Sequence, residues 1–138
     1  MTIFPKNCLL SSIVLMLMTQ ASIAQWERTS GPRDLQISVN GSVFSDGGSL
    51  FAGMGTYGVY FSENKGTFWT PVNAAWPSGA FAACIAVSGN TIYVGTRNGV
   101  LRSAKNSSAW IPVNTGLPAD PYIMFLKNSD TSLYAGID

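Results

Sequence analysis

Short apolar runs separated by turn residues fill most of the chain. In one unit, Ala83–Val87 and Thr91–Val94 are runs of strand length on either side of the turn pair Gly89–Asn90. Val100–Arg102 and Ala109–Val113 add two more short runs. Runs of this length that are bounded by turn residues and rich in β-branched and aromatic side chains predict β-strands. No apolar pattern of helical period and adequate length competes after the N-terminal segment, so we expect an all-β chain.

The predicted strands belong to an internal repeat. Leu50–Gly53 recurs as Ile92–Gly95 and again as Leu133–Gly136, at intervals of 42 and 41 residues. Trp69–Asn73 recurs as Trp110–Asn114, again after 41 residues. Four short antiparallel strands in a unit of this length are typical of one blade of a β-propeller. Another antiparallel sandwich or barrel with regular turns is the alternative.

Two prolines place the fourth strand of each unit. Pro71 and Pro112 have no backbone N–H to donate to a central ladder, which favours a sheet-edge position. We therefore expect a β-propeller fragment of about two and a half four-stranded antiparallel blades, at about residues 35–73, 81–114 and, in part, 122–138. Known propellers have about four or more blades, so further blades or oligomeric partners are needed to close a ring. A truncated product is favoured over oligomerisation, because an incomplete blade exposes an unpaired strand.

The N-terminal segment has a different character from the repeats. Lys6 is its one positive charge, an apolar run follows from Cys8 to Met18, and a more polar stretch ends in Ser22–Ala24. This order predicts a secretory signal peptide over residues 1–24, with residues 25–138 as the mature chain in a secreted or extracytoplasmic location. A buried helix or membrane anchor is the alternative, but a membrane span needs about 20 apolar residues.

Charge and composition exclude several partners. Without Lys6 the chain has no net formal charge, only 11% of its residues are charged and no basic stripe occurs, so no nucleic-acid partner is expected. Histidine is absent, which removes the commonest metal ligand and general base. Cys84 is the single cysteine of the mature chain and lies in an apolar run, which predicts a small buried hydrophobe. We expect no metal, no cofactor and no membrane span after signal removal.

The turn between the predicted third and fourth strands carries the most specific motif. Ser62–Trp69 resembles the Asp-box, Ser-x-Asp-x-Gly-x-x-Trp, of the bacterial neuraminidase repeat propellers, with Asn64 at the aspartate position. The resemblance implies that Ser62 and Asn64 belong to a structural turn in which the Asn64 side chain binds backbone N–H groups. It also implies that Gly66 adopts a left-handed conformation and that Trp69 packs beneath the hairpin.

The second copy of the motif departs from the pattern. Only Ser103 and Trp110 match, while Lys105 stands at the aspartate position and Ser107 at the glycine position. We expect both motif tryptophans to lie in the core. The segment Tyr93–Val100 is also similar to sialidase-like and photosystem-assembly-factor-like propellers. The resemblance spans nearly all of the mature chain, and it implies a fold rather than an activity, because Asp-boxes lie at the blade periphery.

The sequence contains no motif that brings together the residues that catalysis would need. A sialidase-like site requires an arginine cluster for a carboxylate, and a glycoside hydrolase requires two carboxylates that flank one bond. No arginine occurs in the Phe-Arg-Ile-Pro context of the sialidases, and the acidic candidates fall in turns, where carboxylates usually bind local backbone. The residues considered are Arg28, Arg33, Arg97, Arg102, Asp34, Asp46, Glu63, Asp120 and Asp130. Arg102 is expected on a solvated strand face, and no catalytic residue is predicted.

Trp76 lies in a predicted connection between blades rather than on a strand. Packing between blades is favoured, since large apolar side chains are usually buried, and contact with a sugar or protein ligand is the alternative. The expected function is that of a secreted, non-catalytic binding or scaffold module for a protein or carbohydrate ligand that the sequence does not identify. The alternative is a fragment of a sialidase-like glycoside hydrolase whose catalytic residues lie in missing blades.

Overall fold

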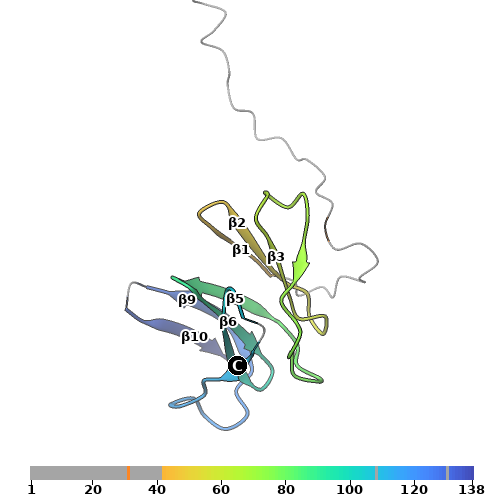
Figure 1. Ribbon diagram of the computed structural model, residues 1–138. Coiled ribbons are helices and arrows are strands. Elements are labelled where there is room, and N and C mark those ends of the chain that lie inside the picture. The colour runs from red at the N-terminus through yellow and green to blue at the C-terminus, as the bar shows by residue number, and fades with distance from the viewer. Residues whose placement is uncertain (1–30, 32–41, 108, 130) are drawn as a thin grey trace, which may run out of the picture.

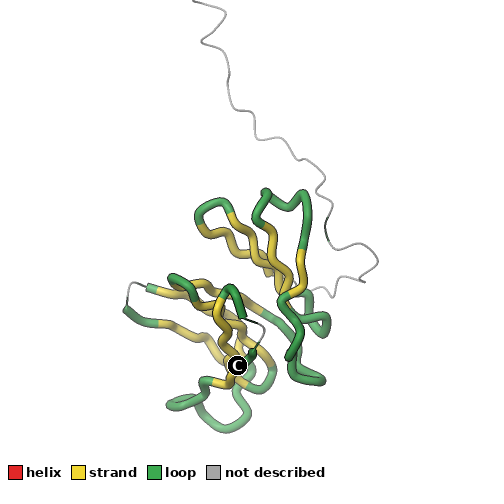
Figure 2. The backbone as a smooth tube through the Cα atoms, in the orientation of Figure 1, coloured by secondary structure: helices red, strands yellow, loops and turns green. Residues whose placement is uncertain are grey.

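The computed structural model describes residue 31 and residues 42–107, 109–129 and 131–138. Within these ranges the chain forms strands and turns without a helix, as Figure 2 shows. The prediction of an all-β fold is confirmed for this part of the chain. No helix in the described ranges is long and apolar enough to cross a membrane. The predicted signal peptide, residues 1–24, lies outside the described residues.

In the described ranges, ten strands form three antiparallel sheets, each built from consecutive strands joined by hairpin turns (Figure 1). The first sheet has the order β1-β2-β3-β4, the second has the order β5-β6-β7-β8, and β9 pairs with β10. The strands are β1 (Ser42–Asp46), β2 (Ser49–Gly53), β3 (Val59–Ser62), β4 (Thr70–Pro71), β5 (Cys84–Ser88), β6 (Thr91–Thr96), β7 (Gly99–Ala104), β8 (Ile111–Pro112), β9 (Ile123–Asn128) and β10 (Leu133–Ile137). Two sheets are therefore four-stranded and antiparallel.

Local turn chemistry sets the register of the first hairpin. Gly47 and Gly48 connect β1 to β2 with φ angles of 57° and 99°. Two consecutive residues at positive φ define the tight turn whose twist matches that of paired strands, and glycine adopts this conformation without steric cost. Asp46 consequently pairs with Ser49, and the ladder runs from there to the pair of Ser42 and Gly53.

The first two strands of the second sheet, β5 and β6, are largely buried on both faces. Successive side chains of a strand point to opposite faces, so neighbours on β6 and β7 separate into two cores. Ile92, Val94 and Leu101 pack in the core toward the first sheet, whereas Tyr93 and Val100 pack in the core toward β9 and β10. Burial on both faces requires near-continuous apolar strands, and four of the five residues of β5 are buried.

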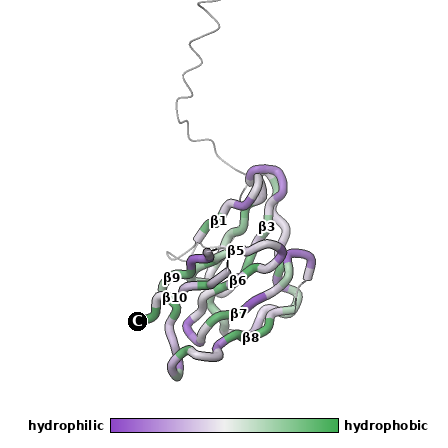
Figure 3. Tube along the Cα trace, turned by 90° about the vertical axis from the view of Figure 1, so that its left-hand side faces the viewer, coloured by the Kyte–Doolittle hydropathy of each residue, from purple (hydrophilic) through white to green (hydrophobic). Residues whose placement is uncertain are grey.

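The three sheets stack face to face in chain order. Strand β5 contacts both β1 and β9, so the first strands of successive sheets adjoin one another. Figure 3 shows hydrophilic colour at turns near the ends of the sheets and also on strand β7. The buried members of the first core are Phe51, Val59, Ala82, Ile85, Val87, Ile92, Val94 and Trp110, and those of the second are Cys84, Val100 and Ile123. Full burial of each large member contributes about 1.5–3 kcal/mol to folding.

The fourth strands are edge strands, as the prolines predict, but they are shorter than expected. The run Ala109–Val113 contains only the two-residue strand β8, which pairs with Leu101 and Arg102 of β7. Pro112 has no N–H to donate, so the regular ladder stops there, although the Val113 N–H still donates to the Val100 carbonyl at 2.9 Å. The prediction of a five-residue strand was wrong.

The two motif tryptophans differ in burial. Trp110 is 8% exposed and belongs to the first core, which confirms the prediction. Trp69 is only half-buried and lies outside both cores, so the prediction was wrong for this residue. Trp110 packs between two described sheets, whereas the segment before the first sheet, residues 32–41, lies outside the described residues.

Candidate functional site

The turn that connects β3 to β4 satisfies its own hydrogen bonds. The Ser62 side chain is 1% exposed, and its Oγ accepts the Gly66 N–H at 2.9 Å. Lys65 and Gly66 adopt left-handed conformations, with φ angles of 56° and 84°. Glycine tolerates this region freely, whereas lysine pays a steric cost, so the buried serine bond holds the turn in a strained form.

Asn64 closes the same turn from the other side. Its Oδ1 accepts the Phe68 N–H at 2.8 Å and the Ser62 hydroxyl at 3.0 Å. The Trp69 indole N–H donates to the Gly66 carbonyl at 3.1 Å. An asparagine side chain that accepts local N–H groups stabilises a turn. The Ser62 hydroxyl, the Asn64 Oδ1 and the Trp69 indole N–H are therefore engaged within the turn.

The second copy of the motif has become a contact between sheets. Ser103 Oγ donates to the Ser107 carbonyl at 3.1 Å, and Ser107 Oγ accepts the Ala109 N–H at 3.1 Å. Lys105, at the aspartate position, forms an ion pair with Asp46 of the first sheet. The Lys105 ammonium also lies 5.6 Å from the ring centroid of Phe51 in that sheet. The substitution at the aspartate position thus supplies an attraction between neighbouring sheets.

Trp76 packs between the first and second sheets. Its ring meets the Trp110 ring edge-on, with centroids 5.0 Å apart and planes at 84°. The Trp76 N–H donates to the Ala80 carbonyl at 3.2 Å, and the Trp110 N–H donates to the Val72 carbonyl at 2.9 Å. Both indole N–H groups are therefore used inside the protein. Leu117 holds the corresponding place at the second core.

An asparagine after each fourth strand clamps the turn before the third strand. Asn114 Oδ1 accepts the Val100 N–H at 2.8 Å, while its Nδ2 donates to the Asn98 carbonyl at 3.1 Å. The side chain fills the space beside Gly99, where a Cβ would collide with it. Asn73 makes the same contacts in the first sheet. Sequence reasoning missed this clamp, although both the asparagine and the glycine recur at the repeat interval.

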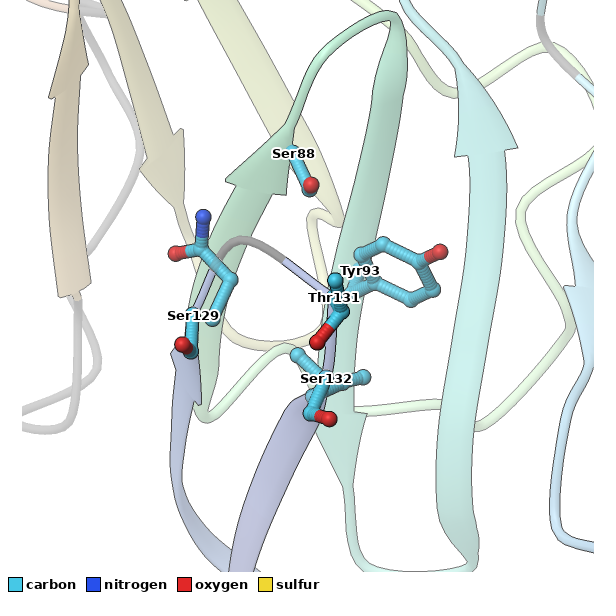
Figure 4. Close-up of a pocket in the computed structure, with 7 residues that line it drawn as sticks. Ser88, Tyr93, Ser129, Thr131 and Ser132 are labelled. Carbon is cyan, nitrogen blue, oxygen red and sulfur yellow. The ribbon is translucent and has the colours of Figure 1, made fainter.

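A small pocket lies between the turn β5–β6 and the hairpin β9–β10 (Figure 4). It measures about 130 Å³, and Ser88, Tyr93, Ser129, Thr131 and Ser132 are among its lining residues. Among the described residues its polar side chains are hydroxyls and one amide, and residue 130 lies outside the described residues. A volume of this size suits a few water molecules, because sites for drug-sized ligands begin at about 300 Å³.

A second pocket combines a cation with an aromatic ring. The connection Pro77–Phe81 and the turn between β6 and β7 enclose about 200 Å³. The Arg97 guanidinium lies over the Phe81 ring, 5.2 Å from its centroid, and is exposed. No carboxylate in the described part of the chain forms a salt bridge with Arg97. Stacking on an aromatic ring orients the planar guanidinium while leaving its outer N–H groups for an acceptor.

Arg102 borders a third, more open depression on the second sheet. This depression measures about 260 Å³ and also has Ile111 in its lining. Arg102 is exposed, as expected for a solvated strand face. The depression is flanked by Ser107 and Ala109, and residue 108 between them lies outside the described residues.

The acidic candidates do not meet at a reaction centre among the described residues. Asp46 pairs with Lys105, and Glu63 is an exposed residue of the turn between β3 and β4. No group of three or more His, Cys, Asp and Glu side chains suited to a metal ion occurs in the described ranges. Arg28, Arg33, Asp34 and Asp130 lie outside these ranges.

Cys84 is buried, as the sequence predicts, and has no disulfide. Burial raises the pKa of its thiol above the ordinary value, even though a backbone hydrogen bond from Gly95 acts in the opposite direction. A thiol with a raised pKa is a poor nucleophile, because the thiolate is the reactive form. Cys84 therefore serves packing.

Comparison with known proteins adds no relative. No protein-family profile matches the chain, and no curated protein is significantly similar to it.

Proposed function

We propose that the chain is part of an exported β-propeller that binds or scaffolds a ligand and does not catalyse a reaction. The face-to-face stacking of successive sheets, with β5 in contact with both β1 and β9, supports the propeller arrangement. The repeat of about 41 residues and the self-satisfied turn Ser62–Trp69 support it as well. The proposal of export rests on the pattern of residues 1–24.

The observation that carries the binding role is the pairing of Arg97 with Phe81. A guanidinium held over a ring beside a pocket of about 200 Å³ offers N–H donors in a fixed plane. Such a plane binds a carboxylate in bidentate fashion, and the apolar edge of the pocket accepts the neighbouring carbon atoms. We assign to this pocket the acidic group of a protein or carbohydrate ligand.

The binding role is tested with a sugar acid and its neutral counterpart. The purified, ¹⁵N-labelled protein is titrated with sodium glucuronate and, separately, with glucose at matched ionic strength, while amide shifts are followed by NMR. We expect glucuronate to move the signals of the Pro77–Phe81 connection and of Arg97, and we expect glucose to move them little. The variant Arg97→Gln removes the guanidinium and should abolish the response.

Arg102→Gln is the matched control, because it makes the same chemical change at another exposed arginine of the second sheet. A response that Arg102→Gln removes and Arg97→Gln spares would place the ligand elsewhere. No response to glucuronate at millimolar concentration would refute an acid-binding role for the Arg97 pocket.

The alternative function, a sialidase-like glycoside hydrolase, would need catalytic groups from repeats beyond the described sheets. It stays a prediction from the family resemblance. Turnover of a fluorogenic sialoside by this chain alone would contradict the binding proposal.

A further inference from the structure

The connection Pro77–Phe81 uses much of its backbone internally on its side of the Arg97 pocket. The Ala80 N–H donates to the Pro77 carbonyl at 3.0 Å, and the Ala80 carbonyl accepts the Trp76 indole N–H at 3.2 Å. The Ser78 side chain also lines the pocket and is exposed. Its hydroxyl forms no hydrogen bond with another described residue, so this side of the pocket offers a ligand a side-chain hydroxyl.

The turn between β6 and β7 offers an amide in the same way. Thr96 Oγ1 donates to the Gly99 carbonyl at 2.8 Å and accepts the Asn98 N–H at 3.1 Å. The Asn98 carbonyl accepts a hydrogen bond from Asn114 Nδ2 at 3.1 Å. The backbone of Asn98 is therefore fully engaged, and so is the Thr96 hydroxyl. The exposed Asn98 side-chain amide, in contrast, has no hydrogen-bond partner in the described part of the chain.

Apolar side chains complete the pocket. Pro77 and Leu101 are half-buried lining residues, and the Phe81 ring lies beneath the Arg97 guanidinium. The volume of about 200 Å³ is smaller than that of sites for drug-sized ligands, which begin at about 300 Å³. The pocket therefore suits a single ring-sized unit with one polar edge and one apolar face.

These groups match a ring that carries both a carboxylate and hydroxyls. The guanidinium binds the carboxylate in bidentate fashion. A hydroxyl both donates and accepts hydrogen bonds, as do the amide of Asn98 and the hydroxyl of Ser78. The C–H face of a sugar ring can pack on the apolar lining. A peptide carboxylate, by comparison, brings main-chain amides that bind to a strand edge or a backbone nest, and the backbone groups of Ala80 and Asn98 are already used.

We propose that the Arg97 pocket binds one uronic acid unit of an acidic polysaccharide and that Asn98 and Ser78 determine its specificity. This inference rests on the proposed binding function and adds the class of ligand. Arg97 holds the carboxylate, and the amide and the hydroxyl bind the sugar hydroxyls. A site built to bind hydroxyls discriminates against an analogue that lacks them, because its polar groups then lose their partners.

The test compares three acids with the ¹⁵N-labelled protein by NMR titration at matched ionic strength. Glucuronate has the carboxylate and the hydroxyls. Cyclohexanecarboxylate has the same charge and a six-membered ring without hydroxyls. N-acetylglycylglycine presents a carboxylate next to main-chain amides. We expect the dissociation constant of glucuronate to be lower than those of the other two acids by about fivefold or more, which corresponds to one or two hydrogen bonds.

Two variants test the residues that bind the hydroxyls. Asn98→Ala should raise the dissociation constant of glucuronate about fivefold and leave that of cyclohexanecarboxylate unchanged. Ser78→Ala should act in the same direction. Asn98 does not have a positive φ and its hydrogen bonds in the turn come from its backbone, so alanine should preserve the fold. Asn90→Ala is the matched control, because Asn90 is an exposed asparagine of the turn between β5 and β6 and does not line the pocket.

The outcomes separate this inference from the function on which it rests. Equal affinity for glucuronate and cyclohexanecarboxylate, lost in Arg97→Gln, would overturn the inference and retain the acid-binding role. A discrimination that neither Asn98→Ala nor Ser78→Ala reduces would also overturn it. Tighter binding of N-acetylglycylglycine, again dependent on Arg97, would assign the pocket to a protein carboxyl terminus. No response to any of the three acids would refute the proposed function itself.

Discussion

Two glycines at the same place in the repeat should respond differently to one substitution. Gly53 and Gly95 both face the following sheet, and neither has a positive φ, so the backbone itself accepts alanine at both positions. A Cβ on Gly53 would have its nearest neighbours at 3.2, 3.3 and 3.4 Å. A Cβ on Gly95 would collide with Cys84 Sγ and lie 2.6 and 2.9 Å from Ile123 Cγ2 and Cβ.

The size of the effect follows from these distances. Gly→Ala at a compatible site stabilises a protein by about 0.4–1 kcal/mol, because it lowers the conformational entropy of the unfolded chain. At Gly53 this gain roughly offsets the energetic cost of moving the neighbouring atoms by a few tenths of an ångström. At Gly95 the Cβ of Ile123 is fixed to the backbone and cannot rotate away, so β9 must move. Overpacking of this kind costs about 1–3 kcal/mol. We expect Gly95→Ala to be less stable than Gly53→Ala by about 2 kcal/mol.

The measurement is urea-induced unfolding followed by circular dichroism at one fixed protein concentration, with comparison of midpoints and m-values. Adding Gly95→Ala to the Cys84→Ala variant should lower the free energy of unfolding by less than Gly95→Ala lowers it in the unmodified protein. Cys84→Ala removes one of the two clashing side chains, while Ile123 remains. Equal midpoints for Gly53→Ala and Gly95→Ala, or a larger loss for Gly53→Ala, would refute the argument from docking distances.

Two further predictions concern the turn motif and the buried thiol. Asn64→Asp should raise the free energy of unfolding by about 0.5 kcal/mol at neutral pH, because a carboxylate accepts the Phe68 N–H more strongly than an amide does. Asn106→Asp, in the exposed turn of the second copy, adds the same charge and should bring no such gain in thermal or urea unfolding. Burial raises the pKa of Cys84, so the folded state keeps its thiol proton at a pH where the unfolded chain has lost it. The stability from this source is fully present below the ordinary thiol pKa and is lost as the pH rises toward the raised value. Cys84→Ser should therefore flatten the alkaline decline of stability in urea titrations, and an equal decline in both proteins would count against this account.

The sequence predicts where strands and turns occur because their causes are local. Gly47 and Gly48 suit positive φ angles, and alternation of apolar residues follows from the two-residue period of a strand. Pro112 lacks an N–H, which places its strand at an edge. The repeat interval then predicts that successive units share one strand order, as the first two sheets do.

The candidate pocket could not be predicted in the same way. Arg97 and Phe81 are separated by the strands β5 and β6, and only the return of the chain through those strands brings the guanidinium over the ring. Lys105 and Asp46 belong to different sheets, and their ion pair depends on how those sheets stack. Contacts between distant segments leave no periodic signal in the sequence.

The sequence by itself determined the strands, the tight turns and the edge position of the prolines, because backbone conformation and two-residue alternation act over a few neighbouring residues. Only the tertiary structure decided which face of each sheet is covered. Trp69 and Trp110 occupy equivalent positions in the repeat, yet only Trp110 is buried, in the core between the first and second sheets. Burial is the removal of surface from water by another part of the protein, so it depends on the neighbouring sheet and not on the residue's own segment.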